Sequence, residues 1–74
     1  MNVVLSPHAR ERMELRNITE DMVRETLKHP EKTETSFRRR TIVYRRFQEG
    51  IIKVPFVTEG DIQHVITVIW ESRI

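Results

Sequence analysis

The chain has 74 residues, of which 38% are hydrophobic and 32% charged, and its formal net charge is +2. A chain of this length buries only about 60% of the surface that its unfolded form exposes, so we expect one domain with a single layer of helices on a sheet. The absence of cysteine excludes disulfides and thiolate metal sites. The first apolar run is too short for a signal peptide or a membrane span, which predicts a soluble cytoplasmic protein with no membrane partner.

The first predicted elements are a short strand over residues 2–5 and a helix over residues 7–15. Ser6 is a favoured N-cap. Pro7 suits the first helical position because its missing N–H has no intrahelical partner there. Residues 16–18 interrupt the helical pattern. We therefore expect the chain to turn at this point.

A second helix is predicted to begin after Thr19, which is a suitable N-cap. Glu20 and Asp21 lie in its first turn, where the helix dipole favours negative charge. The pair His29-Pro30 ends this helix, because the residue before a proline avoids helical backbone.

The remainder of the chain has strand patterns over residues 32–36, 41–47, 51–58 and 62–70. Turn residues separate the last three segments, which indicates consecutive hairpins. Pro55 predicts that its strand lies at a sheet edge or carries a bulge. The sequence thus predicts an α+β fold of order β-α-α-β-β-β, with two helices on one face of an antiparallel sheet and the other face partly open.

Alternation along the strands and helical spacing assign the buried side. The predicted core comprises Ala9, Met13, Met22, Val23, Thr26, Leu27, Ile52, Val54, Phe56, Ile62, Ile66, Val68 and Trp70. The open face is predicted to carry Tyr44, Arg46, Lys53 and Thr67, with the apolar residues Ile51, Val57 and Ile69. Exposed apolar residues of this kind indicate a surface that another chain covers.

The first helix carries a candidate catalytic group. His8 and Arg12 are four residues apart and share a face of the helix, and Arg16 follows at its end. The dipole at the helix start favours a neutral His8 imidazole, which could remove a proton from a ribose 2′-hydroxyl. Arg12 could then hold the phosphate. Structural roles remain open alternatives: His8 can bond near the helix start, Arg12 can pair with acids, and Arg16 can cap the last carbonyls.

The positive charge is mostly arginine, and five arginines lie between residues 38 and 46. Arginine suits bidentate phosphate contacts better than lysine does. The candidate RNA-binding residues are Arg38, Arg39, Arg40, Arg45, Arg46 and Lys53. A solvated loop is the alternative for the run of arginines from residue 38 to residue 40. Arg45 and Arg46 are neighbours in a strand, so one of them must point toward the helix-packed face.

Three further side chains complete the candidate set. Tyr44 could stack on a base or supply a phenolic proton, and Thr67 could bind a phosphate oxygen from the open face. Packing and strand propensity are the alternatives for both. His64 is expected among the core-side residues. The three histidines show no metal-ligand spacing, so the sequence predicts neither a metal nor another cofactor.

The run Leu5-Ser6-Pro7-His8-Ala9 continues with Arg12-Met13, Arg16-Asn17-Ile18 and Val23. With Leu27-Lys28-His29-Pro30, Val43-Tyr44 and the segment of residues 65–69, it resembles a small prokaryotic family known as domain of unknown function 4258. The similarity extends over nearly the whole chain.

That family resembles in fold the RelE/ParE-like and BrnT-like toxins of bacterial toxin–antitoxin pairs. The resemblance implies one RelE-like domain over residues 1–74 and a metal-independent ribonuclease activity. It also implies RNA as substrate, with the ribosome as a possible setting, and a small antitoxin protein as partner. Carried onto matching positions, it assigns the catalytic site to His8, Arg12, Arg16, Tyr44 and Thr67.

Three functions follow as hypotheses, and the third is a scaffold domain stabilised by a partner chain that covers Ile51, Val57 and Ile69. In the first, the protein is a toxin-like endoribonuclease: His8 or Tyr44 deprotonates the 2′-hydroxyl, and Arg12 and Arg16 stabilise the phosphorane, leaving a cyclic phosphate. In the second, the same arginines bind RNA or a protein partner without cleavage, and His8 is structural.

Overall fold

Helix α1 (Pro7–Arg16) begins where the sequence predicts. The Ser6 hydroxyl accepts a hydrogen bond from the Ala9 backbone N–H at 3.0 Å, which satisfies a donor that the first turn cannot pair. The helix ends at Arg16, one residue beyond the predicted end, and the left-handed backbone of Asn17 (φ 55°) closes its last turn. These observations come from a computed structural model, which describes residues 2–74.

Helix α2 (Glu20–Lys28) is also bounded as predicted. The Thr19 hydroxyl accepts a hydrogen bond from the Met22 N–H at 3.1 Å. Acidic side chains occupy the first turn and a lysine the last, so both ends complement the helix dipole. The helix ends at Lys28, and its C-cap His29 lies directly before Pro30.

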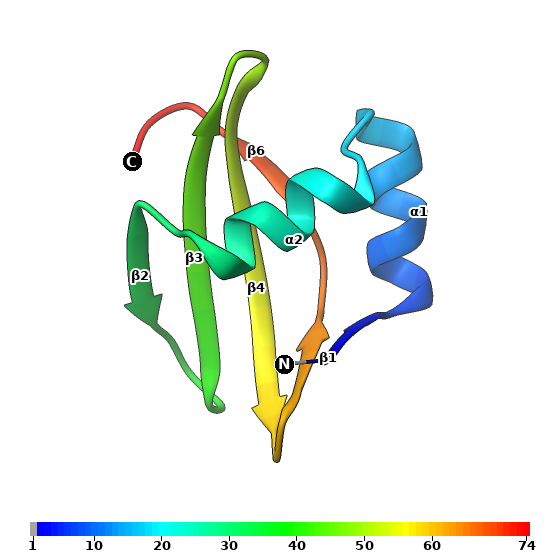
Figure 1. The fold of residues 1–74 in the computed structure, drawn as a ribbon, viewed down its shortest axis with the longest axis vertical. Coiled ribbons are helices and arrows are strands. Elements are labelled where there is room, and N and C mark those ends of the chain that lie inside the picture. Colours follow the sequence, from blue (N-terminus) through cyan, green and yellow to red (C-terminus); the bar gives the residue numbers. More distant parts are fainter. Residues whose placement is uncertain (1) are drawn as a thin grey trace.

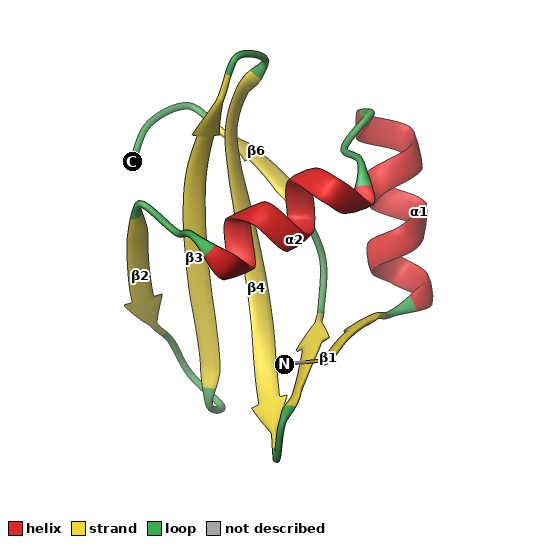
Figure 2. Cartoon of the chain, viewed as in Figure 1, coloured by secondary structure: helices red, strands yellow, loops and turns green. Residues whose placement is uncertain are grey.

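The described strands form one sheet in the order β1-β5-β4-β3-β2, with β6 paired to the other end of β4 from β5 (Figures 1 and 2). Their bounds are β1 (Asn2–Leu5), β2 (Lys32–Thr35), β3 (Arg40–Phe47), β4 (Gly50–Glu59), β5 (Ile62–Val65) and β6 (Ile69–Glu71). The predicted α+β fold and element order are confirmed. One detail differs: β1 pairs with β5 in parallel, so the sheet is mixed rather than wholly antiparallel.

Helices α1 and α2 together form the connection from β1 to β2 (Figure 1). Helix α2 crosses in front of β3 and β4 and packs on both strands, whereas α1 contacts β6. The helical segment therefore carries the chain from one edge of the sheet to the other. The opposite face of β3 and β4 is the open face that the sequence predicts.

The last predicted strand, over residues 62–70, is interrupted at residues 66–68. Val65 pairs with Phe56 and Trp70 pairs with Ile52. The interval is thus five residues on this side and four on β4, so the interrupted segment contains one extra residue. Because side chains alternate along a strand, one extra residue moves the following side chains to the other face.

Pro55 supplies the physical reason for the interruption. Its carbonyl accepts a hydrogen bond from the Ile66 N–H at 3.0 Å, so this edge of β4 faces residues 66–68. Proline has no N–H to continue the ladder on that edge. β4 is an interior strand, so the expected irregularity is found in its neighbour rather than at an edge.

The core lies between the helices and the sheet. Its buried members are Leu5, Ala9, Met13, Ile18, Val23, Val43, Ile52, Val54, Phe56, Val65 and Val68. Two predicted core positions are wrong: Ile62 and Ile66 are only partly buried, while Val65 is 1% exposed. The extra residue explains this, because the side chains before the interruption alternate in the opposite sense to Val68 and Trp70. Beyond the interruption, the predictions for Val68 and Trp70 are confirmed, because both belong to the core or pack against it.

Candidate functional site

The predicted catalytic residues of α1 differ in how they are engaged. His8 is exposed in the first turn. Arg12 is 35% exposed and has a single distant ion pair, 4.0 Å from the Glu11 carboxylate. Arg16 instead donates a hydrogen bond at 2.5 Å to the backbone carbonyl of Val68. The guanidinium of Arg16 therefore anchors the fold.

This anchor belongs to a set of contacts that join α1 to the interrupted strand. The Trp70 indole N–H donates to the Arg16 carbonyl at 2.8 Å, and the Ser6 hydroxyl donates to the Ile66 carbonyl at 3.1 Å. Buried polar groups of an interrupted strand need such partners, because the ladder no longer provides them. We call Ser6, Arg16 and Trp70, together with the carbonyls to which their side chains donate hydrogen bonds, the α1 anchor.

Thr67 does not lie on a strand, which corrects its predicted place on the open strand face. It sits between Ile66 and Val68, the two residues that the α1 anchor holds. Within residues 2–74, no hydrogen bond or ion pair joins Thr67 to His8 or Arg12. The structure brings Thr67 next to the anchoring contacts of α1 without linking it to a catalytic group.

Tyr44 lies on the open face, as predicted, but it is engaged. Its hydroxyl donates to the Glu34 carboxylate at 2.6 Å, and its side chain is almost fully buried. The hydrogen bond to Glu34 raises the pKa of Tyr44 to about 12, and burial adds to the effect. The same bond lowers the pKa of Glu34. A phenol with so high a pKa is not a base at neutral pH.

Two lysines flank the Tyr44 ring. The ammonium of Lys32 lies 5.4 Å from the ring centroid and that of Lys53 lies 5.9 Å away. Lys32 also pairs with Glu34 at 3.5 Å. Cross-strand pairing explains the cluster, because Lys32 and Lys53 lie opposite Tyr44 on β2 and β4. Lys53 is partly exposed on the open face, where it lies close to the cluster that contains the Glu34 carboxylate.

The apolar residues predicted on the open face differ in their exposure. Ile51 is only 8% exposed, which corrects its expected exposure, whereas Val57 and Ile69 are partly exposed. His64 also belongs to this face, because it pairs with Val57. Its side chain is 40% exposed and lies 3.2 Å from the Glu59 carboxylate, so the expectation that it lies among the core-side residues, buried or at the rim, is wrong. The partner protein expected on this face stays a prediction.

The two arginines of β3 point to opposite faces, as alternation predicts. Arg45 donates a hydrogen bond at 2.6 Å to the carbonyl of His29, the residue that caps α2. A cation at the end of a helix also complements its dipole. Arg46 is exposed on the open face, and only its backbone N–H is engaged, by Glu31 at 2.6 Å. Arg45 thus closes α2, while Arg46 is available to a ligand.

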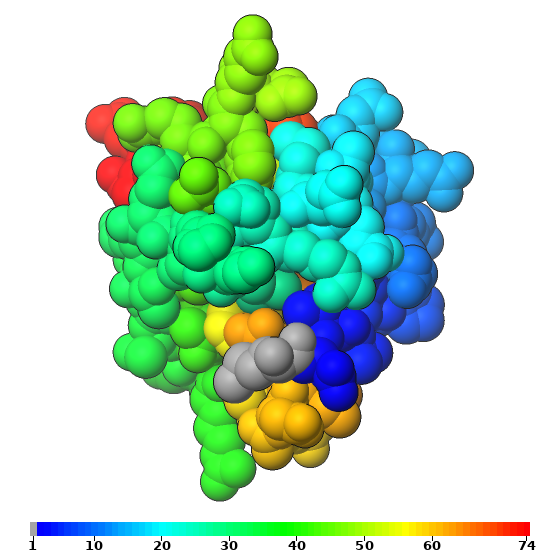
Figure 3. Space-filling model, viewed as in Figure 1, coloured from blue at the N-terminus to red at the C-terminus, as the bar shows by residue number. Residues whose placement is uncertain are grey.

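The turn between β2 and β3 holds the other predicted RNA-binding arginines. Arg38 and Arg39 both have positive φ, 59° and 63°, and the Arg40 N–H donates to the Phe37 carbonyl at 3.2 Å. Two positive φ values at the centre of a four-residue turn are typical of type I′, which favours Asn-Gly. Figure 3 shows this turn, in green, projecting from the lower end of the molecule. We call Phe37 to Arg40 the basic turn.

The basic turn combines three features. Arg38, Arg39 and Arg40 are all exposed, and none of the ion pairs within residues 2–74 involves them. Each arginine in left-handed backbone costs about 1–2 kcal/mol relative to a relaxed conformation. Phe37 is 87% exposed, more than any other large apolar side chain described. The turn therefore presents unpaired cations and an aromatic ring on strained backbone.

Sequence reasoning did not single out Phe37 or Glu34. The strand predicted over residues 32–36 ends in the structure at Thr35, which leaves Phe37 in the turn. An aromatic residue directly before three arginines is a signal that could have identified it. Glu34 had no such signal, because its bond to Tyr44 depends on the cross-strand register.

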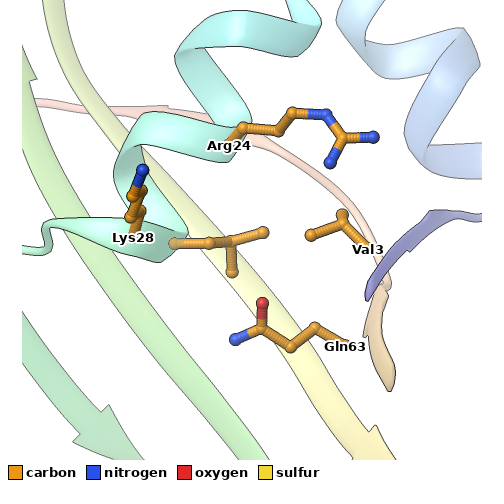
Figure 4. A pocket seen from close by; sticks show the side chains of 5 residues that line it. Val3, Arg24, Lys28 and Gln63 are labelled. Atoms are coloured by element: carbon orange, nitrogen blue, oxygen red, sulfur yellow. The ribbon is translucent and has the colours of Figure 1, made fainter. Parts of the chain in front are cut away.

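A separate hollow of about 480 Å³ lies between α2 and the β1–β5 pair (Figure 4). Val3 and Leu27 give it apolar walls, and Arg24, Lys28 and Gln63 line its rim. None of the predicted site residues lines it. The Arg24 guanidinium is already engaged by Glu20, 3.1 Å away on the same helix.

Two further observations concern the described part of the chain. None of its helices has the length and apolar character that a membrane crossing requires. Residues 2–74 also contain no group of three or more histidine, aspartate or glutamate side chains placed to hold a metal ion.

Comparison with known proteins gives one match. No curated protein and no solved structure is detectably similar to the chain. The profile of the family described as "Domain of unknown function (DUF4258)" matches residues 5–70, which include both helices and every strand except part of β1 and the end of β6. The chain belongs to the DUF4258 family.

Proposed function

We propose that this protein is an RNA-binding module that contacts the phosphate backbone through its basic turn. One observation carries the proposal: three consecutive arginines are exposed and have no acidic partner among the described residues. Other arginines of the chain are engaged, Arg16 with a carbonyl of the interrupted strand and Arg45 with the carbonyl that ends α2.

The chemistry of the basic turn suits phosphate. A guanidinium offers a planar pair of donors that matches two phosphate oxygens, and it keeps its charge at any physiological pH. Adjacent arginines on a projecting turn can reach successive phosphates of one strand. Arg46 and Lys53 add positive charge on the open face, next to Glu34 and Glu71.

A variant that removes the three charges tests the proposal. We expect Arg38→Gln/Arg39→Gln/Arg40→Gln to bind a labelled RNA about 10- to 50-fold more weakly than the wild type at moderate salt. The slope of log affinity against log salt should fall by about 2, because about 0.7 counterions are released per phosphate contact on a single strand. Fluorescence anisotropy across a salt series measures both quantities.

The matched control is Arg10→Gln/Lys28→Gln/Arg73→Gln, which removes the same charge from exposed positions elsewhere. Its affinity should stay within about threefold of the wild type, since charges that do not contact phosphate act only through the long-range field, which salt screens. Equal weakening in the two triple variants would show that net charge, and not the basic turn, binds RNA.

A second candidate is the metal-independent ribonuclease, which a separate observation favours. His8 is exposed in the first turn of α1, and Arg12 is accessible one turn later on the same face. In this mechanism, His8 takes the proton from a 2′-hydroxyl, which attacks the adjacent phosphorus, and Arg12 stabilises the added charge. The 5′-oxygen leaves with a proton from a second acid. Arg16 and Tyr44 play no part, because both are engaged in the fold.

Cleavage and binding are separated by one assay. RNA is incubated with the protein in EDTA, and the products are examined for 2′,3′-cyclic phosphate ends. Cyclic ends that form with the wild type and are lost in His8→Ala would support the ribonuclease. Intact RNA that remains bound would support the module without cleavage. Cleavage by His8→Ala at the wild-type rate would remove His8 from the mechanism.

A further inference from the structure

The basic turn contains an aromatic side chain that no role in the fold explains. Phe37 is 87% exposed and belongs to neither the core nor the residues packed against it. A single exposed apolar residue is ordinary on a protein surface. Here it adjoins two arginines in strained backbone, and that coincidence gives it meaning.

The other described non-glycine residue with positive φ is Asn17, and asparagine tolerates this backbone conformation better than arginine does. Arg38 and Arg39 have φ of 59° and 63°, where Asn-Gly would fit with little cost. These arginines do not stabilise the fold through ion pairs, because none of the ion pairs within the described residues includes them. Residues with strained backbone cluster at functional sites.

The two cations and the ring form a recognisable chemical combination. Proteins that bind single-stranded nucleic acid pair phosphate-binding cations with aromatic rings on which unpaired bases stack. The bases of a duplex are already stacked on one another, and the deep major groove of an RNA helix admits no side chain. An exposed ring at the end of a hairpin can therefore stack on a base only where the strand is unpaired.

We infer that Phe37 is a stacking platform for an unpaired nucleotide, with Arg38 and Arg39 holding its flanking phosphates. The inference rests on the proposed RNA binding and narrows it to single-stranded segments. A membrane surface is the less suitable target. One apolar side chain and a few cations are a small attachment, whereas stable anchoring takes two lipid-binding signals.

The first test compares an unpaired RNA oligomer with a fully paired RNA of the same length. We expect the wild type to prefer the unpaired oligomer, and Phe37→Ala to lose about 5- to 150-fold in affinity for it. Phe37→Trp should retain the wild-type affinity, because its ring also stacks. Leu15→Ala is the control, since Leu15 is an exposed apolar residue of α1.

The second test separates the fold from RNA binding. Replacing Arg38-Arg39 with Asn-Gly should relieve the strained turn and raise the Tm by about 4–8 °C or more. The same variant should bind the unpaired oligomer more weakly, with a salt slope reduced by about 1.4. A gain in Tm together with a loss of affinity is expected if the two strained arginines contribute to RNA binding and not to the stability of the fold.

The possible failures are distinct. No binding of either RNA by the wild type would overturn the proposed function and this inference together. Equal binding of paired and unpaired RNA, with no effect of Phe37→Ala, would overturn only this inference. Binding to vesicles of anionic lipid that depends on Phe37, without a preference for unpaired RNA, would assign the turn to a membrane and also overturn it.

Discussion

The α1 anchor and the basic turn use the same side chain in opposite ways. In the anchor, the guanidinium of Arg16 donates a hydrogen bond to the carbonyl of Val68, a fully buried residue. In the basic turn, Arg38 and Arg39 have no ion-pair partner among residues 2–74, and their backbone is strained. An arginine can therefore be assigned to ligand binding only after its contacts within the fold are known.

The largest effect is expected from breaking the anchor. Arg16→Met keeps most of the aliphatic stem but leaves the Val68 carbonyl without its charged donor. We expect the free energy of unfolding to fall by about 2–3 kcal/mol, the cost of losing a charged hydrogen bond to a buried group. Urea denaturation measures the change. Arg10→Met, at an exposed position of the same helix, should change it by less than about 0.5 kcal/mol.

Equal destabilisation by these two variants would contradict the distinction between Arg16, which anchors the fold, and Arg10, which has only an exposed ion pair with Glu20 at 3.9 Å. The affinity of folded Arg16→Met for RNA should remain that of the wild type, because Arg16 is not offered to a ligand.

A smaller effect is expected from Trp70→Phe, which removes the indole N–H that serves the Arg16 carbonyl. The free energy of unfolding should fall by about 1–2 kcal/mol, since a part-buried acceptor loses its partner and some packing is lost. Combined with Arg16→Met in a double-mutant cycle, the two changes should couple by at least about 0.5 kcal/mol. Strict additivity would show that these contacts are independent and that the α1 anchor is not one unit.

The smallest effect concerns Tyr44, which we assign to the scaffold and not to catalysis. Folding raises the pKa of Tyr44 from 10.0 to about 12. A raised pKa stabilises the fold fully below the unfolded value, and this stabilisation is lost as pH rises from about 10 to about 12. The urea midpoint of the wild type should therefore decline across this range more steeply than that of Tyr44→Phe. Parallel profiles for the two proteins would remove the Glu34 bond as the cause.

Glu34 shows the opposite sign at acid pH. Its pKa is lowered, first by the hydrogen bond from Tyr44, so its contribution is present above the unfolded pKa and is lost as pH falls through the folded value. Tyr44→Phe should reduce this acid dependence as well, which the same set of denaturation curves would reveal.

The helices could be predicted closely from the sequence because their signals are local. Ser6 and Thr19 cap the helices through bonds to residues three positions onward, and Pro30 limits α2. Such contacts depend on neighbouring residues alone, so a single sequence contains them. The strand at residues 62–70 was less predictable. Its interruption depends on Pro55, which becomes its neighbour only when the sheet forms.

The candidate site was predictable in residue type but not in use. The arginine-rich segment was recognised, and Arg38, Arg39, Arg40 and Arg46 are exposed. Arg16 and Arg45 were assigned to phosphate, yet both donate to backbone carbonyls that lie far along the chain or at the end of a helix. Tyr44 likewise depends on a cross-strand neighbour. These uses are set by tertiary contacts, which composition and periodicity do not contain.

The most direct test of the central claim is a comparison of two triple variants with equal charge. Arg38→Gln/Arg39→Gln/Arg40→Gln and Arg10→Gln/Lys28→Gln/Arg73→Gln are measured against the same labelled, unpaired RNA across a salt series. We expect the first variant to lose affinity by about 10- to 50-fold, with a salt slope lower by about 2, and the second to stay within about threefold of the wild type. Wild-type affinity and slope in the first variant, or equal losses in both, would contradict RNA binding by the basic turn.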